Sequence, residues 1–332
     1  MNGDMVCADQ AWLRTLEARL VRRLRLEHAA NVFPLGHVLT YYAILVLLAW
    51  HGVINALWLR ALLWSLLVML NYSLSIGVMH MHAHRKLFTS RWPNRVLEFL
   101  LCFPCVHDYP SMRYVHVYLH HRYEDGPNDP TSTAGYRTGW RMLQYWVLYA
   151  PHSKWITGRA LFAPDAKSIW RRLRGQFLFD APMCMLIAVA WAGVDLHGMV
   201  SLWLVPMLIV WTNIGFFAWL THAPATGPKI NGSFNTTNRW MNLLVHNQGF
   251  HVVHHRYPGV HWTAIPGRFD LMLEVDDRLI APYWVLLTSA WHVATPRTLR
   301  DPRYARRWKR RYLERRGSRR VRTPLLPYFG WV

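Results

Sequence analysis

Acidic residues and cysteines are both scarce in this chain. It carries 18 aspartates and glutamates against 38 lysines and arginines, which gives a formal net charge of +20. Three long stretches contain no charged side chain at all: residues 28–59, 61–84 and 196–228. Each is long enough for at least one helix of about 20 residues across a bilayer. These stretches argue against a soluble two-domain protein of 332 residues and predict one membrane-embedded unit.

The four cysteines are too few and too scattered for a disulfide framework. Cys102 and Cys105 form a CxxC motif, but they lie within an apolar run. They are therefore expected to be small buried core residues rather than a redox or metal pair. The N-terminus, MNGDMVCADQ, lacks the basic and apolar regions of a signal peptide, so no cleaved signal is expected.

The apolar runs predict four transmembrane helices, near residues 33–53, 58–80, 177–194 and 199–220. Breaks at HGVINALWLR and at DLHG would join them in two hairpins. In that arrangement 37 of the 38 Lys and Arg residues lie on one side of the membrane, and only Arg60 lies near the other. The basic side is expected to be cytoplasmic. The predicted fold class is an all-α integral membrane protein, with four transmembrane helices in two hairpins, both termini in the cytoplasm, and a cytoplasmic helical cap.

The segments outside these spans are predicted to stay on the cytoplasmic side. Residues 1–32 contain an amphipathic helix, with leucines opposite arginines, that is expected to lie on the membrane surface. Residues 279–294 are apolar but short, so an interfacial or packed helix is expected there rather than a fifth span. The tail, residues 296–332, has thirteen basic and two acidic residues between 297 and 322. Beside a membrane it should attract anionic lipid rather than nucleic acid. The membrane domain is then residues 33–295.

Histidines gather in three clusters, each on a segment expected to reach the cytoplasmic face. In chain order the clusters are His80 and His84; His116, His120 and His121; and His251, His254 and His255. On helices, these spacings place two or three imidazoles of a cluster on one face. His222, at the inner end of the fourth predicted span, is a further candidate.

Clustered imidazoles indicate metal binding. Neutral imidazole is a ligand for iron, copper or zinc, and three clusters on one side of a membrane can enclose more than one ion. The HExxH motif is absent, which argues against a zincin-type protease. A non-catalytic metal transporter or sensor is the alternative from a different class. Transport, however, requires polar residues at the midplanes of the spans, and Asp180 is the only acidic residue within a predicted span.

The clusters, written HMHAH (80–84), HVYLHH (116–121) and HVVHH (251–255), resemble the three histidine boxes of the integral-membrane fatty acid desaturase and hydroxylase superfamily. The resemblance covers residues 33–295. It implies a non-haem diiron centre, in which two iron ions activate O2 as a co-substrate and remove hydrogen from an acyl chain. It also implies that the iron ligands are His80, His84, His116, His120, His121, His222, His251, His254 and His255.

Four further residues adjoin the boxes. His82 makes the first box denser than the family pattern, His246 and His261 flank the third, and Asn247 follows His246. All four are expected to lie beside the ligands and support them. Ligation by the three histidines stays open as an alternative.

The resemblance implies an O2-dependent oxidoreductase of fatty acid metabolism, and desaturation is the leading interpretation. A fatty acid hydroxylase and a terminal-alkene-forming fatty acid decarboxylase share the same boxes and remain alternatives. The substrate would be a fatty acid or an acyl thioester, and membrane lipids would surround the enzyme. No GxGxxG motif or cytochrome b5 module occurs in the sequence. Electrons are therefore expected from a separate donor, such as ferredoxin with its reductase, attracted by the basic inner face.

Overall fold

The computed structural model describes residues 15, 17–50, 54–105, 108–136, 139–164, 168–223, 233, 235–269, 280–281, 310 and 314. Two predicted segments lie almost wholly outside these residues: the interfacial helix at 279–294 and the basic tail at 296–332. The amphipathic segment at the N-terminus is described only from Thr15 onward, where its later part is helical.

Four apolar helical runs are long enough to cross a membrane: Ala29–Ala49, Leu57–His84, Trp170–Val194 and Leu196–His222. They confirm the number of apolar helices expected from the sequence. The first consists of η1 (Ala29–Asn31) and α2 (Val32–Ala49), and the second of α3 (Leu57–Tyr72), the π-helix η2 (Ser73–Met79) and α4 (His80–His84). The third lies in α9 (Ser168–Val194), and the fourth comprises α10 (Leu196–Met199), η4 (Val200–Leu204) and α11 (Val205–His222).

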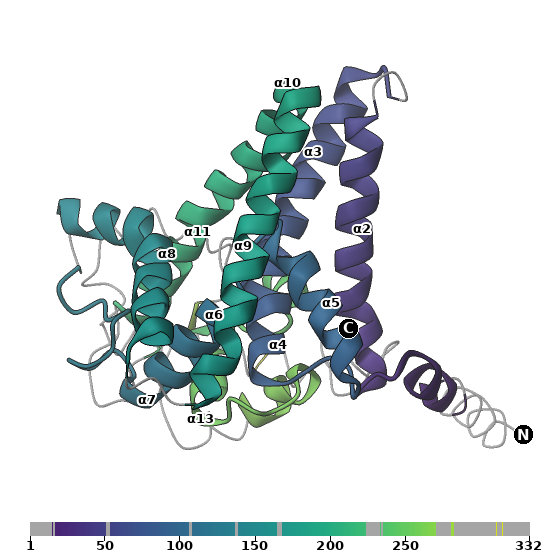
Figure 1. The fold of residues 1–332 in the computed structure, drawn as a ribbon. Helices are drawn as coiled ribbons and strands as arrows, with labels where there is room; N and C mark the ends of the chain where they lie inside the picture. The colour runs from purple at the N-terminus through teal and green to yellow at the C-terminus, as the bar shows by residue number, and fades with distance from the viewer. Residues whose placement is uncertain are drawn as a thin grey trace, which may run out of the picture.

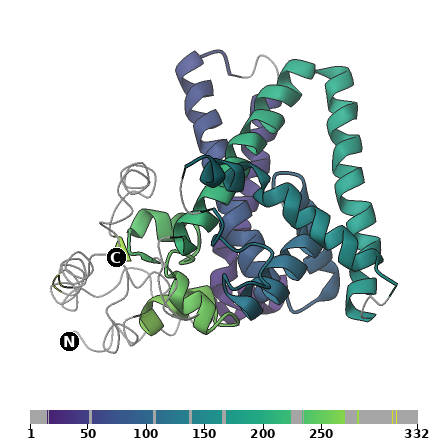
Figure 2. The same ribbon diagram turned by 90° about the vertical axis from the view of Figure 1, so that its left-hand side faces the viewer.

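The long helices are apolar on their outer as well as their inner faces. Leu39 on α2 is 71% exposed and Val189 on α9 is 64% exposed. A helix that is apolar all round suits a lipid environment rather than water. In Figure 1, α2 and α3 lie side by side, and α9 meets α10 at the end where that pair turns. Figure 2 shows that both pairs turn at the same end of the molecule.

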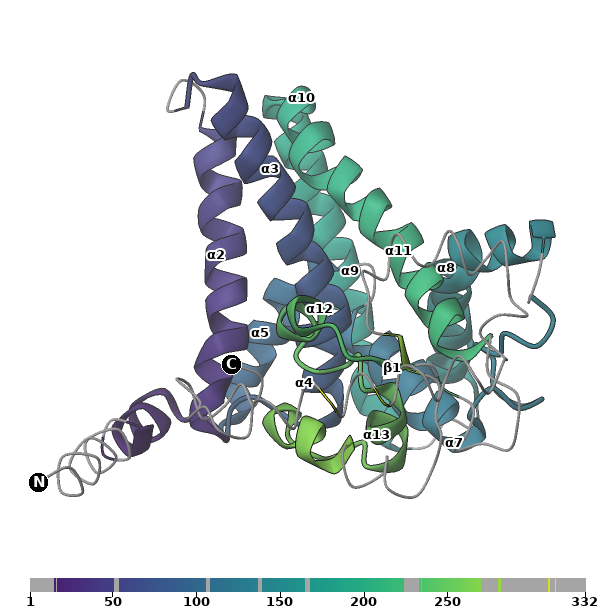
Figure 3. The same ribbon diagram turned by 180° about the vertical axis from the view of Figure 1, so that it is seen from behind.

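Shorter helices gather at the opposite end. Between the second and third apolar runs lie α5 (Arg91–Cys102), α6 (Tyr109–Ser111), the π-helix η3 (Met112–His120), α7 (His121–Tyr123) and α8 (Gly139–Phe162). After α11 come β1 (Asn235–Thr236), α12 (Arg239–Leu244), α13 (His251–Arg256), η6 (Trp262–Ala264) and β2 (Ile280–Ala281). The two short strands pair in parallel. Figure 3 shows α4, α7 and α13 together at this end, away from the turns.

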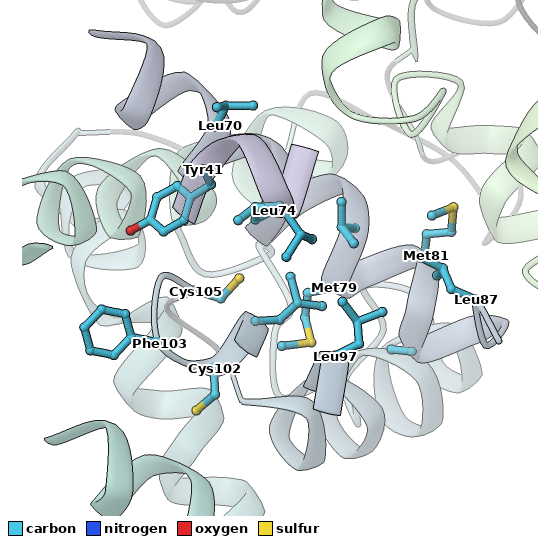
Figure 4. Packing of buried hydrophobic residues seen from close by; sticks show 14 of the residues in the cluster. Tyr41, Leu70, Leu74, Met79, Met81, Leu87, Leu97, Cys102, Phe103 and Cys105 are labelled. Atoms are coloured by element: carbon cyan, nitrogen blue, oxygen red, sulfur yellow. The ribbon is translucent and has the colours of Figure 1, made fainter. Parts of the chain in front are cut away.

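The largest hydrophobic cluster packs α2, α3, η2 and α5 against one another. Figure 4 shows Tyr41, Leu74, Met79 and Leu97 converging within it. Cys102 and Cys105 are buried, unpaired members of the same cluster, as their apolar surroundings predicted. The cluster fixes α4, which follows directly from η2, and so fixes the position of the first histidine box.

Two local features hold the apolar helices in place. A Cβ atom on Gly215 would lie 2.3 Å from the main-chain oxygen of Trp146, so glycine allows α11 to approach α8 closely. On α9, the buried carboxylate of Asp180 accepts hydrogen bonds from the guanidinium of Arg95 on α5. The one acidic residue predicted within a span is therefore neutralised by an ion pair rather than facing a transport path.

Candidate metal centre

Nine histidines converge in two adjacent groups at the end of the helices opposite to the turns. The five-histidine group comprises His80, His84, His116, His121 and His254, and the four-histidine group comprises His120, His222, His251 and His255. Within each group, every residue offers a nitrogen that lies within 4.8 Å of the others. The ring centroids of His121 and His255, which belong to different groups, are 4.6 Å apart, so the two groups share a wall.

Four segments supply these side chains. The first box, at the end of α4, faces the five-histidine group, and His222, the last residue of α11, faces the four-histidine group. The second and third boxes each divide between the groups: His120 separates from His116 and His121, and His254 separates from His251 and His255. The sequence boxes therefore do not correspond to individual groups.

A π-helix explains how the second box divides. In an α-helix, residues five apart such as His116 and His121 point about 140° away from each other. The wider turn of η3 reduces that angle, so both side chains reach the five-histidine group. The ring of His120 lies 4.7 Å from that of His222, in the four-histidine group. A second π-helix, η2, leads directly into His80.

The Nε2 atoms of the five-histidine group are crowded together. The Nε2 atoms of His80 and His116 are 2.5 Å apart, and those of His121 and His254 are 2.8 Å apart. The Nδ1 atom of His80 faces the main-chain oxygen of Ile76 at 3.2 Å, which fixes the ring and turns Nε2 toward the group. The Nε2 atom of His84 is buried without a hydrogen-bond partner among the described residues.

In the four-histidine group, Asp129 orients one member. Its Oδ2 atom lies 2.7 Å from Nδ1 of His120, and this carboxylate is fully buried. The amides of Asp125 and Thr131 also donate to Asp129. A hydrogen bond from Nδ1–H to a carboxylate leaves Nε2 unprotonated and more basic, which is the form that binds a metal. The Nε2 atom of His251 lies 2.9 Å from that of His222 and 3.1 Å from that of His255.

Burial keeps these imidazoles neutral. It lowers the pKa of His116, His121 and His254 well below 6.5, and the neighbouring imidazoles lower it further. The same two causes lower the pKa of His251 and His255. For Asp129, burial alone would raise the pKa, but hydrogen bonds from His120 and Thr131 outweigh it and hold the pKa below its usual range. The site thus combines neutral imidazoles with one ionised carboxylate behind them.

The donor set fits metal ions. Neutral imidazole nitrogens carry lone pairs, and several of them converging at 2.5–3.3 Å cannot all be satisfied by one another. A buried unpaired polar atom is costly, and His84 contributes one. A cation within each group would accept these lone pairs. Groups of five and four imidazoles suit iron, copper or zinc rather than calcium or magnesium, which prefer oxygen ligands.

An apolar cavity reaches both groups. Its apolar lining includes Ile76, Met112, Ile214 and Phe217, from η2, η3 and α11, and tyrosines of α8 complete it. The cavity contains about 520 Å³ of space, part of it open to solvent. The histidines that it touches are His80, His116, His120, His222 and His251. A mainly apolar ligand in this cavity would contact both groups at once.

The four residues expected beside the ligands lie outside both groups. His82 points toward Glu98, with Nε2 and Oε1 3.2 Å apart, and His246 packs its buried ring against Phe33 and Trp262. The side-chain amide of Asn247 donates to the main-chain oxygen of Trp262. Among the described residues, no hydrogen bond or ring contact joins His82, His246, Asn247 or His261 to the nine histidines.

These residues instead hold the segments that carry the ligands. Nε2 of His261 lies 3.0 Å from Oδ1 of Asn31, which ties the segment after α13 to the first apolar run. Gly77 leaves room for His246, because a Cβ at that position would be 2.4 Å from Nδ1 of the histidine. Their role in the structure is therefore indirect.

Sequence reasoning missed several supporting residues. Asp129 lies nine positions after His120 in a turn-rich segment, EDGPNDP, and an acidic residue shortly after a histidine box is the signal that could have identified it. Glu98 on α5 accepts from Lys86 and approaches His82. Burial alone would raise the pKa of Glu98, but these two partners lower it to about 2. The Oδ1 atom of Asn235 accepts from the amide of Val252 and so positions α13.

Comparison with known proteins gives two matches. A family model described as "Fatty acid desaturase" matches residues 56–287, a range that contains all nine histidines. The protein named "Dihydrorhizobitoxine desaturase" from Bradyrhizobium elkanii is 27% identical over 255 residues, which is 69% of this chain. The chain spans 65% of the length of that relative.

Proposed function

Because the chain belongs to the fatty acid desaturase family, we propose that it is a membrane-bound, non-haem diiron oxidoreductase that uses O2 to desaturate a fatty acyl chain. One observation carries the proposal: two all-imidazole groups, one buried and one partly buried, lie side by side, and a single apolar cavity reaches both. Such a cavity can hold an alkyl chain against two metal ions at once.

The nine histidines are proposed as the iron ligands, with one ion in each group. When bound, the two irons would supply the activation of O2 and the removal of hydrogen. The overall reaction balances when one O2, two electrons, two protons and two hydrogen atoms of the chain give two waters and one carbon–carbon double bond. Asp129 would keep His120 in its ligating tautomer throughout, because its carboxylate accepts the Nδ1 proton.

The cavity would position the substrate. Ile76, Met112 and Phe217 would contact the chain, exclude water and hold its methylene groups next to both histidine groups. The hydroxyl of Tyr145 already donates to the main-chain oxygen of Thr131, so it presents mainly its ring to the cavity. An alkyl chain, rather than a polar substrate, suits this lining.

Desaturation is favoured over hydroxylation and decarboxylation by the name of the relative, which is a desaturase. The substrate in that name is dihydrorhizobitoxine, and it is assigned to that protein only. For this chain we propose a fatty acid or an acyl thioester, in keeping with the family and the apolar cavity. A separate electron carrier, such as ferredoxin with its reductase, would supply the two electrons.

We further propose that the four apolar helices form two transmembrane hairpins, with the histidine groups and both termini on the cytoplasmic side. The excess of basic residues outside the spans supports this orientation. Single cysteines introduced at Trp50 and at Arg122, in a background without the native cysteines, should react with an impermeant maleimide from opposite sides of sealed vesicles. Labelling of both from the same side would contradict the arrangement.

Metal content and activity together test the function. Wild-type protein purified in nanodiscs with iron is expected to contain about two irons per chain. His251→Ala should lose iron from the four-histidine group and lose activity, because its imidazole is central to that group. His152→Ala, an exposed histidine of α8 outside both groups, is the matched control and should retain both properties. A folded His251→Ala protein with full iron and full activity would contradict the proposal.

Product analysis identifies the reaction. Nanodisc-bound protein would be supplied with saturated free fatty acid, O2, ferredoxin, its reductase and NADPH, and the lipids and headspace gas analysed by mass spectrometry. A product lighter by two hydrogens is the expected result. A hydroxy acid, or an alkene one carbon shorter, would replace desaturation by one of the two alternatives of the same family. Metal uptake into vesicles without O2 consumption would indicate a transporter instead.

A further inference from the structure

A basic residue follows each of the three histidine boxes directly. Arg85 follows His84, Arg122 follows His121, and Arg256 follows His255. All three arginines are exposed, and the side chain of Arg85 retains 42% of its accessible surface. Arg85 follows α4, Arg122 lies within α7 and Arg256 is the last residue of α13, and these three helices lie at the same end of the molecule in Figures 1 and 3. With two neighbours, they form a surface that we call the basic rim: Arg85, Lys86, Arg122, Arg256 and Arg268.

Two residues of the basic rim form ion pairs within the protein, and three do not pair with any described residue. Arg85 pairs with Glu27, and Lys86 pairs with Glu98. Arg122, Arg256 and Arg268 form no ion pair with any residue that the structure describes. Within the described part of the chain, these three exposed guanidinium groups therefore have no carboxylate partner. Unneutralised charge of one sign around a functional opening attracts partners of the opposite sign.

A narrow cleft leads from the basic rim to the five-histidine group. It reaches His84 and His254, and its lining mixes polar side chains, among them Arg85, Lys86 and Gln248, with apolar ones such as Met81 and Leu87. The cleft and the apolar cavity have no lining residue in common. The centre thus has two separate approaches, one suited to an alkyl chain and one that Arg85 and Lys86 of the basic rim line.

The five-histidine group is also the more accessible of the two. His84, His116 and His121 are only partly buried, whereas all four members of the other group are buried. An imidazole ligand with one edge near the surface is the shortest covalent connection between a docked redox protein and a buried metal. His84, which is partly buried and lines the cleft, occupies that position.

We propose that the basic rim is the docking surface of an acidic one-electron carrier protein, and that electrons enter the centre through His84. The inference rests on the proposed function. In each docking event, the reduced carrier loses one electron and the metal centre gains it, with no atom transferred. Two such events supply the two electrons that the desaturation consumes.

The test measures binding separately from turnover. The probe is an acidic [2Fe–2S] ferredoxin with gallium in place of iron, which docks but transfers no electrons. Its affinity for the full chain, in nanodiscs of zwitterionic lipid, is measured at low and high ionic strength. For wild type, affinity should fall as salt rises, because the attraction is between exposed charges.

The variant is Arg122→Glu/Arg256→Glu/Arg268→Glu, which leaves the paired residues Arg85 and Lys86 intact. It should weaken binding about tenfold or more at low salt and flatten the salt dependence. The matched control makes the same charge change at exposed arginines that do not belong to the basic rim: Arg141→Glu/Arg159→Glu/Arg239→Glu. The control should change the affinity by less than about twofold.

Turnover with two reductants completes the test. Free fatty acid is the substrate, so that no acyl carrier protein is needed. With limiting native ferredoxin, the rim variant should lose activity in proportion to its affinity, while with reduced methyl viologen it should match wild type. The second result shows that the metal centre and cavity are intact. If no product forms with either reductant, the proposed function fails, and the binding data still decide the docking surface.

Three outcomes would overturn the docking proposal. One is a rim variant that binds gallium ferredoxin as wild type does. Another is an equal loss in the rim variant and in the control, which would indicate a general charge effect. The third is a rim variant that keeps ferredoxin binding but loses binding to acyl carrier protein or to anionic vesicles, which would assign the basic rim to a substrate carrier or to lipid headgroups.

Discussion

Replacing Asp129 by asparagine should weaken metal binding in the four-histidine group while leaving the five-histidine group intact. The carboxylate is fully buried, and its Oδ2 atom lies 2.7 Å from Nδ1 of His120. Each oxygen of Asp129 accepts from a main-chain amide as well, at 2.8 Å in both cases. Asparagine has the same shape, but it provides one acceptor atom instead of two and carries no charge.

The size of the effect follows from these contacts. Without the carboxylate, His120 can place its proton on Nε2, the nitrogen that faces the metal, and the ligand is lost in that tautomer. Removing a carboxylate behind a ligating histidine typically reduces metal affinity by about 10- to 100-fold. This corresponds to about 1.4–2.7 kcal/mol. Loss of an acceptor for a buried amide should also lower the free energy of unfolding, by about 1–3 kcal/mol.

The assay is the affinity of apoprotein for Co(II), whose visible absorption reports on each coordination environment. The expected result is one unchanged site and one weakened by about 10- to 100-fold. Asp125→Asn is the control, because Asp125 holds the same loop through Thr133 but does not contact a histidine. It should lower thermal stability without changing either affinity. Two unchanged sites in Asp129→Asn, in protein shown to be folded, would refute this explanation of the centre.

Three further predictions concern stability, measured as thermal unfolding in detergent. Gly215→Ala should destabilise the protein by about 1–3 kcal/mol, because the added Cβ would meet the main chain of Trp146. Gly193→Ala is the control and should be neutral, because there is open space around Gly193. Equal stability of the two variants would be evidence against close packing of α8 and α11. Arg95→Met should lower the free energy of unfolding by about 3–5 kcal/mol, because it leaves Asp180 buried and unpaired. The double variant Arg95→Met/Asp180→Leu should recover most of that stability. If it recovers none, the loss is not electrostatic. Burial lowers the pKa of His261 to about 3, with smaller contributions from His28 and Arg85. The unfolded chain therefore binds the proton more readily than the folded protein. As a result, stability is lost as pH falls below 6.5. His261→Gln should lose stability less steeply between pH 7 and pH 5, and an identical slope would contradict this assignment.

Local properties of the chain were sufficient to predict the four apolar helices and the three boxes. A transmembrane helix satisfies its own main-chain hydrogen bonds, so its length and its lack of charged residues are enough to predict it. The structure has four such apolar helices, which is the number predicted. The family was likewise predicted from the spacing of histidines within HMHAH, HVYLHH and HVVHH, and the family match confirms it. The nine histidines chosen as ligands are those that the structure brings together, and their ligation stays a prediction that the metal assays test.

The tertiary structure decided which histidines act together. His116, His120 and His121 follow one another closely, yet the π-helix directs them to two groups, and the length of a π-helix depends on packing around it rather than on local sequence. On a helix, His82 points away from the face that His80 and His84 share, but its contact with Glu98 on α5 is made only when the helices pack. The two separate approaches to the centre arise in the same way. Each is lined by residues far apart in sequence, whose proximity is fixed by the folded bundle and by no local property of the chain.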